Sequence, residues 1–135
     1  MMSMAALIAA MALAAAQPAG GARNCADPQS QAEMNLCASS DYERADDEFI
    51  ALWPQIIDEV RRSDIELGPV ADGRVSGEAK LREAQQAWVA FRDAHCTMVG
   101  YEARGGSMEP MLYNRCRAQL TRDRVAQLRR AIGLP

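Results

Sequence analysis

Residues 30–60 read SQAEMNLCASSDYERADDEFIALWPQIIDEV, and their pattern predicts one long amphipathic helix. Ser30 stands three residues before Glu33, which is the capping-box spacing, so a helix is predicted to begin near residue 30. Apolar residues then recur at steps of three and four, at Met34, Cys37 or Ala38, Tyr42, Ala45, Phe49, Leu52 or Trp53, Ile56 and Val60. This stripe is typical of one long helix with one face against a core. Pro54 lies inside it and predicts a kink or a restart near Leu52-Trp53, because proline lacks the N–H and its ring crowds the preceding turn.

Two further helices are expected after one long loop. Between Ser63 and Gly77 the periodicity is lost among glycine, proline and aspartate, which indicates the loop. Helical spacing returns from Glu78 to about Ala103, through Leu81, Ala84 or Gln85, Trp88, Phe91 or Arg92, His95 and Val99. Gly105-Gly106 ends that segment. Ser107 is expected to cap a third helix, whose stripe is Met111 or Leu112, Cys116, Leu120, Val125, Leu128 and Ile132.

Composition agrees with a single small helical domain. The chain has 135 residues, 49% hydrophobic, 24% charged and only 5% aromatic, which excludes a two-domain enzyme and a wholly disordered chain. We therefore predict an all-α fold, a small antiparallel three-helix bundle over residues 30–132, with residues 17–29 as a lead-in. The net charge is −3, so nonspecific binding to nucleic acid is not expected.

The first sixteen residues resemble a secretory signal. Residues 1–16 hold no charged side chain and end in three alanines, so cleavage is expected after Ala16, or as late as about residue 19. The run is shorter than the roughly 20 residues that a membrane-spanning helix needs, so no stable membrane anchor is expected after cleavage. Cys25 follows Ala22-Arg23-Asn24 and does not resemble a lipid-modified cysteine. The expected location is the periplasm or the exterior.

Four cysteines in an exported chain are expected to form two disulfides, which would cross-link the bundle. Cys96 lies ten residues before Gly106 and Cys116 ten residues after it, so the two would sit level on facing helices. A level partner for Cys96 on the first helix would lie near residue 46, which is about 14 Å from Cys37 and too far for a bridge. We therefore predict the pairs Cys96–Cys116 and Cys25–Cys37.

No constellation for catalysis is found. His95 is the single histidine, and no Gly-x-Ser-x-Gly elbow accompanies it. Adjacent carboxylates such as Asp46-Asp47-Glu48 point in different directions on a helix. The chain has no paired Cys-x-x-Cys spacing, phosphate loop, dinucleotide fingerprint or calcium loop. We therefore expect no metal, no cofactor and no enzymatic activity, although a small cell-wall hydrolase using His95 or Asp93 is kept as a minor alternative.

Charge is distributed unevenly along the chain. Residues 27–66 hold eleven acids against three arginines, a net of −8, and residues 104–130 hold seven arginines against two acids, a net of +5. One interpretation is that the first and third helices pair their charges across the bundle surface. The other is an acidic face that attracts a basic partner.

A recognisable signature begins at residue 84. Residues 84–96 read AQQAWVAFRDAHC, and this is similar to the A-Q-x-A-W-x-x-F-R-D-x-x-C pattern of the LprI-type lysozyme-inhibitor family. Gly105-Gly106-Ser107, Pro110-Met111, Cys116 and Thr121-x-x-Arg124 follow in the family's order. Residues 31–38, QAEMNLCA, and 42–46, YERAD, match its front end. The resemblance covers about residues 25–131.

The resemblance implies an exported binding protein, most concretely one that blocks a lysozyme-like glycosidase by protein–protein contact. An envelope structural or adaptor module without inhibitor activity is the alternative. The signature side chains are expected to be mainly structural; they are Gln85, Trp88, Phe91, Arg92, Asp93, Gly105, Gly106, Thr121 and Arg124. Trp88 and Phe91 are expected in the core. Arg92 and Asp93 are expected to tie helices together through buried or half-buried hydrogen bonds, and Gln85 to bond a neighbouring backbone group. The partner-binding candidates are the 64–77 loop and five acids, Asp46, Asp47, Glu48, Asp58 and Glu59.

Overall fold

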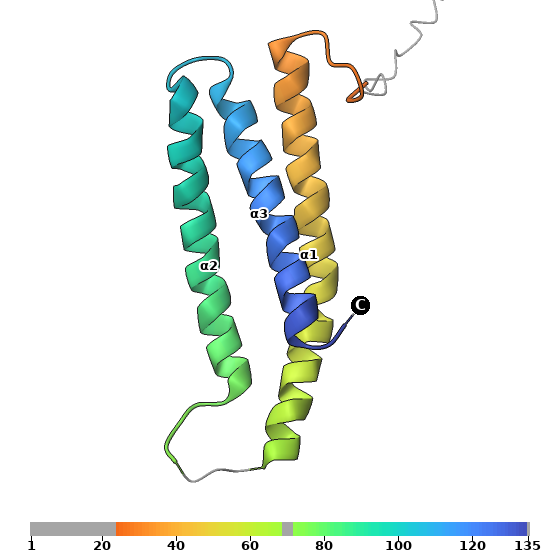
Figure 1. Cartoon of the computed structure of the whole chain (residues 1–135), viewed down its shortest axis with the longest axis vertical. Coiled ribbons are helices and arrows are strands. Elements are labelled where there is room, and N and C mark those ends of the chain that lie inside the picture. The colour runs from red at the N-terminus through yellow and green to blue at the C-terminus, as the bar shows by residue number, and fades with distance from the viewer. Residues whose placement is uncertain (1–23, 69–71, 135) are drawn as a thin grey trace, which may run out of the picture.

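A computed structural model describes residues 24–68 and 72–134, and in this part of the chain all regular structure is helical. Three long helices, α1 (Gln31–Leu67), α2 (Gly77–Gly100) and α3 (Glu109–Ala131), run down, up and down in Figure 1, with a short 3-10 helix, η1 (Tyr101–Ala103), after α2. Figure 1 shows α3 running alongside α1, with α2 on the other side of α3. The predicted all-α three-helix bundle is confirmed. The predicted signal, residues 1–16, lies outside the described residues.

Helix α1 begins where the capping box predicts. The Ser30 hydroxyl accepts the Glu33 N–H at 3.2 Å, and a Glu33 carboxylate oxygen accepts the Gln29 N–H at 2.6 Å. The helix is continuous through Pro54 for 37 residues, so of the two expected outcomes, a kink or a restart, the restart is excluded. Pro54 and Ile50 both lie on the exposed side, where water can satisfy the carbonyl that proline leaves without a donor. The helix also continues to Leu67, which shortens the predicted loop.

The last turn of α1 caps the start of α2. The Asp64 carboxylate accepts the Gly77 N–H at 2.9 Å and the Glu78 N–H at 3.0 Å, while the Ser76 hydroxyl accepts the Ala79 N–H. These are donors that a helix N-terminus leaves without intrahelical partners. A Cβ at residue 77 would lie 2.8 Å from Asp64 Oδ1, so a larger residue there would displace this carboxylate. The loop therefore joins two helices whose ends are bonded directly to each other.

The turn before α3 differs from the expectation at one residue. Met108 and not Ser107 is the N-cap of α3, and its side chain makes no capping hydrogen bond. Glu109 reaches back instead, and its carboxylate accepts the Gly105 N–H at 2.7 Å. Gly105 has a φ of 77°, a conformation that favours glycine. Ser107 contributes its carbonyl, which accepts the Asn35 side-chain N–H at 2.9 Å and ties the turn to α1.

Helices α1 and α3 form the apolar core, which is thin. Leu52 and Ile56 of α1 pack with Val125 and Leu128 of α3. Partly buried side chains surround this cluster, namely Phe49, Trp53, Leu81, Ile132 and Leu134.

Both predicted disulfides are confirmed: Cys96–Cys116 joins α2 to α3 with Cα atoms 5.4 Å apart, and Cys25–Cys37 joins the lead-in to α1 with Cα atoms 5.6 Å apart. Within the described ranges, no helix combines the length and apolar character needed to cross a bilayer.

Candidate functional site

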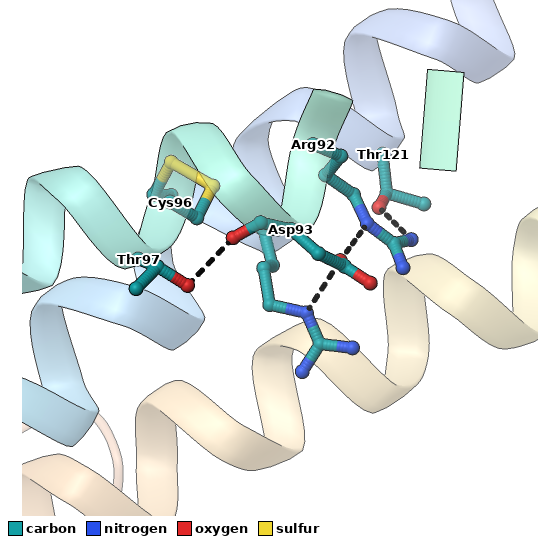
Figure 2. Close-up of a disulfide and its surroundings, with 7 residues drawn as sticks. Arg92, Asp93, Cys96, Thr97 and Thr121 are labelled. Atoms are coloured by element: carbon teal, nitrogen blue, oxygen red, sulfur yellow. Dashed lines mark hydrogen bonds and ion pairs between the residues drawn. A yellow bond between two sulfur atoms is a disulfide. The ribbon is translucent and has the colours of Figure 1, made fainter. Parts of the chain in front are cut away.

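Helix α2 turns polar side chains toward the other helices. Arg92 is only 5% exposed, and its guanidinium donates from Nε to Asp93 at 2.9 Å and from Nη1 to Thr121 of α3 at 3.3 Å (Figure 2). The same Nη1 lies 3.5 Å from the Asp46 carboxylate of α1. Figure 2 also shows Arg92 and Asp93 about one turn from the Cys96 disulfide. One side chain thus joins all three helices where two of them are already cross-linked.

Two aromatic rings enclose this guanidinium. The Arg92 Cζ lies 5.3 Å from the Tyr42 ring centre and 5.2 Å from the Trp88 ring centre. Arg117 of α3 lies over the same Tyr42 ring at 3.6 Å. Arg124 lies over Trp88 at 5.7 Å. Partly desolvated cation–π contacts of this kind stabilise by about 1–2 kcal/mol each. We call these residues, with Gln85, Asp93 and Thr121, the arginine cluster.

A hydrogen bond completes the arginine cluster at one end, and an ion pair completes it at the other. Arg124 donates from Nε to the Gln85 side-chain oxygen at 3.1 Å, so Gln85 bonds a side chain of α3. At the other end Arg117 Nε is buried without a hydrogen bond of good geometry, although it lies 3.5 Å from Asp93 Oδ1. Asp93 therefore lies between two arginines.

Burial and charge shift the pKa values in the arginine cluster. Burial of Arg92 by itself lowers its pKa, but the hydrogen bond to Asp93 and the nearby negative groups outweigh it, so the net pKa is raised. Burial raises the pKa of Tyr42, although the arginines oppose it. Burial lowers the pKa of Arg124. Arg92 thus stays charged and Tyr42 stays neutral at ordinary pH. The interactions of Arg92 with the other helices therefore persist over the ordinary pH range.

Six of the nine signature residues belong to the arginine cluster, and Gly105 and Gly106 lie in the exposed turn before α3. Phe91 is 55% exposed, so the prediction of a core position for it was wrong. Its ring stacks on His95 with centroids 5.4 Å apart. Consecutive residues of a helix point about 100° apart, so residues 91 and 92 cannot both face the bundle interior. Arg92 takes the inward position, where it bonds Thr121, and Phe91 is left facing solvent.

The five acidic candidates do not form one patch. Asp46 faces Arg92, as above, and Glu48 lies 3.5 Å from Arg129 of α3. Glu59 pairs with Arg62 in its own helix, and Asp58 with Arg61 at 3.3 Å. A second bridge between α1 and α3, Asp41 to Arg122 at 3.0 Å, resembles the Glu48 pair. Part of the opposite charge on α1 and α3 is therefore paired across the bundle.

Two of the candidates share the exposed side of α1. Asp47 and Asp58 are eleven residues apart, which places them about three turns apart on the same face. The same face also carries Glu43, Ile50 and Pro54, all exposed. We call Glu43, Asp47, Ile50, Pro54 and Asp58 the outward α1 face. It combines three carboxylates with the exposed apolar side chains of Ile50, at 59% exposure, and Pro54, and Arg61, the partner of Asp58, lies at its end.

Two cavities lie near the candidate regions. One of about 580 Å³ lies at the 64–77 end of the bundle, beside the exposed side chains of Ile65, Leu67 and Val75. A groove of about 480 Å³ lies between α1 and α2, lined by Phe49, Trp53, Arg82, Gln85, Gln86 and Val89. The groove was not predicted, because its residues lie on two separate helices. Among the described residues, no three or more His, Cys, Asp or Glu side chains are grouped to hold a metal ion.

Comparisons with known proteins agree with the sequence signature. The protein-family model described as Lysozyme inhibitor LprI matches residues 22–128. A protein of Rhizobium meliloti (strain 1021), described as uncharacterized, is 41% identical over 106 residues, which covers 78% of this chain and 76% of that protein. No solved structure matches the chain.

Proposed function

The chain belongs to the LprI lysozyme-inhibitor family, and from this premise we propose that it is an exported protein that blocks a lysozyme-like muramidase by protein–protein contact. The family match over residues 22–128 is the observation that supports the proposal most directly. The family is one of inhibitors, which fits a protein that acts by binding and transforms no substrate.

The cysteines support the exported location. The two disulfides involve all four cysteines of the sequence. Disulfides persist in the periplasm and outside the cell, whereas cytosolic thiols are kept reduced. A muramidase acting on the cell wall would be met in the same compartment.

The outward α1 face is the contact surface that we propose. A basic muramidase would be attracted to its carboxylates, and Ile50 would supply apolar area at the centre of the contact. The rest of the bundle holds this face rigid, because α1 is tied to α2 and α3 by the arginine cluster. A preorganised surface loses little entropy on binding.

The proposal is tested by inhibition assays with charge-reversal variants. We expect the double variant Asp47→Lys/Asp58→Lys to inhibit a sensitive lysozyme at least about tenfold more weakly than the unaltered chain, because each substitution places like charges opposite each other. The matched control is Asp27→Lys/Asp123→Lys, which changes the net charge equally at exposed positions outside the outward α1 face. The two double variants should therefore differ in inhibition.

The same assays would expose an error in the proposal. An excess of oxidised protein that leaves a panel of lysozymes fully active at low salt would exclude the inhibitor function. Equal losses in the two double variants would exclude the outward α1 face as the contact. Capture of a different envelope protein in place of lysozyme, in a pull-down from the producing organism, would favour the adaptor alternative.

A further inference from the structure

A second face of the molecule, on α2, is apolar and exposed to solvent in the part of the chain that the structure describes. On α2 and the first residue of η1, six positions alternate by three and four residues, and all six are exposed; they are Ala84, Ala87, Phe91, Ala94, Met98 and Tyr101. Phe91, Met98 and Tyr101 are 55%, 59% and 47% exposed. We call these six residues the α2 stripe. Their spacing is the heptad pattern of helices that pair with another helix.

The α2 stripe points away from the bundle. The buried residues of α2 are Gln85, Arg92, Cys96 and Gly100. At 100° per residue, the centre of the α2 stripe lies about 160° around the helix from the centre of that buried set. In Figure 1, α2 is an outer helix of the bundle, with α3 beside it and α1 beyond. The α2 stripe is therefore open to a partner that approaches from outside.

The sizes of the side chains in the α2 stripe match an antiparallel copy of the same helix. If two α2 helices run antiparallel about a two-fold axis between residues 92 and 93, large side chains meet small ones at every level. The facing pairs are Ala84 with Tyr101, Ala87 with Met98, and Phe91 with Ala94. Each pair occurs twice because of the two-fold symmetry. A parallel pair would instead place Phe91 against Phe91 and leave alanine against alanine.

The flanking charges match the same arrangement. Glu83 lies beside the α2 stripe on α2, Arg104 is the residue that follows η1, and both are exposed. With the two-fold axis between residues 92 and 93, Glu83 of one copy lies level with the end of η1 in the other, so it would come close to Arg104 of that copy at both ends of the interface. Within the chain Arg104 lies over the Tyr101 ring at 4.5 Å, so its guanidinium already lies beside the α2 stripe.

We propose that this protein forms a two-fold symmetric dimer in which the α2 stripes of two copies pack antiparallel. The proposal does not depend on the muramidase, because it uses a different helix and a different partner. Because the α2 stripe and the outward α1 face lie on different helices, each on the exposed side of its own helix, the dimer would leave both outward α1 faces accessible. A dimer could then present two inhibitory surfaces.

The dimer is tested by sedimentation of the oxidised chain, without residues 1–16, from about 1 to about 200 µM, because mass action favours association at high concentration. We expect a monomer–dimer equilibrium for the unaltered chain. Phe91→Glu should be monomeric throughout, because it buries a carboxylate at the centre of the interface. Ile50→Glu, an equivalent change at an exposed apolar residue of α1, should leave the dimer intact. Circular dichroism checks that both variants fold.

Charge exchange tests the orientation. Glu83→Arg and Arg104→Glu should each weaken the dimer several-fold, because each places like charges opposite each other at both ends. The double variant Glu83→Arg/Arg104→Glu restores opposite charges and should recover most of the lost affinity. No recovery would overturn the antiparallel arrangement.

Other results would overturn the dimer itself. A monomer at every concentration would do so, and so would a dimer that Phe91→Glu leaves unchanged. A monomeric chain whose lysozyme inhibition is lost with Phe91→Glu would assign the α2 stripe to the muramidase in place of a second copy.

Discussion

At residue 92 a charged side chain takes the place of a core residue. Arg92 is buried, yet each of its polar contacts reaches a different part of the bundle: Asp93 in α2, Asp46 in α1 and Thr121 in α3. A hydrocarbon side chain could fill the volume but could not bond all three. Since the apolar core is thin, these directional contacts add specificity to the packing of the helices.

Replacement of Arg92 should therefore be costly. Arg92→Met is expected to lower the free energy of unfolding by about 2–3 kcal/mol, because Asp93 and Asp46 lose their cation while remaining partly buried. Arg44→Met removes an arginine paired with Asp41 at 3.1 Å on the exposed side of α1, and it should cost at most about 0.5 kcal/mol. Urea unfolding of the oxidised proteins measures both values. Equal losses would show that Arg92 does not tie the bundle together.

Glu78 should make the junction of α1 and α2 sensitive to acid. Hydrogen bonds from Arg61 and Arg82 lower the pKa of Glu78 below its ordinary value of 4.5. The stability that this carboxylate contributes is thus fully present above its unfolded pKa and is lost as the pH falls through the lower, folded pKa. The unaltered chain should be more stable than Glu78→Gln at pH 7, and this difference should shrink on acidification below about pH 4.5. Urea midpoints at pH 7 and pH 3 measure it; a constant difference would contradict the prediction.

The side chains that form the site were only partly predictable. The signature located Gln85, Trp88, Arg92 and Thr121, but periodicity left Phe91 and Arg92 as equal candidates for one inward position. Hydrophobicity wrongly placed Phe91 in the core, while the expectation that Arg92 ties helices together through buried hydrogen bonds is confirmed. The choice depends on the rings of Tyr42 and Trp88 and on the carboxylates of Asp46 and Asp93, which come together only in three dimensions.

At the scale of the helices, prediction was better because the signals are local. Ser30 with Glu33 located the start of α1, and equal spacing about Gly106 predicted Cys96–Cys116. The start of α3 was wrong, because Glu109 bonds the Gly105 N–H and no Ser107 cap is formed. The extension of α1 to Leu67 was not predicted, because the sequence after Ser63 has no apolar periodicity. The last turn of α1 is instead bonded to the start of α2, where Asp64 accepts the Gly77 N–H.

The two disulfides should contribute unequally to stability. Cys96→Ala/Cys116→Ala should cost about 3 kcal/mol or more, because Cys96 is fully buried and the bridge joins two packed helices. Cys25→Ala/Cys37→Ala should cost less. Cys25 lies in the exposed lead-in, and residues 24–29 can regain freedom without opening the core. Thermal unfolding of both double variants provides the comparison. The reverse order would mean that the lead-in supports the bundle more than its burial suggests.

For the whole molecule, the uneven charge has two consequences that belong to different surfaces. Two ion pairs, Asp41–Arg122 and Glu48–Arg129, join α1 to α3. Part of the acidic charge of α1 is therefore neutralised by the basic charge of α3. On the opposite side of α1, the carboxylates of the outward α1 face remain exposed to solvent. The two interpretations of the charge distribution are therefore compatible, since helical geometry separates the residues that serve each.

If the outward α1 face attracts a basic muramidase, association should depend strongly on salt. We expect the association rate to fall about tenfold between roughly 20 and 500 mM salt, with a much smaller change in the dissociation rate, because screening acts mainly on the approach of the two molecules. Asp47→Lys/Asp58→Lys should associate slowly at low salt and respond weakly to added salt, while Asp27→Lys/Asp123→Lys should keep most of the salt dependence. Stopped-flow binding or surface plasmon resonance measures both rates. An association rate that does not change with salt in the unaltered chain would show that apolar contact, and not charge on α1, brings the two proteins together.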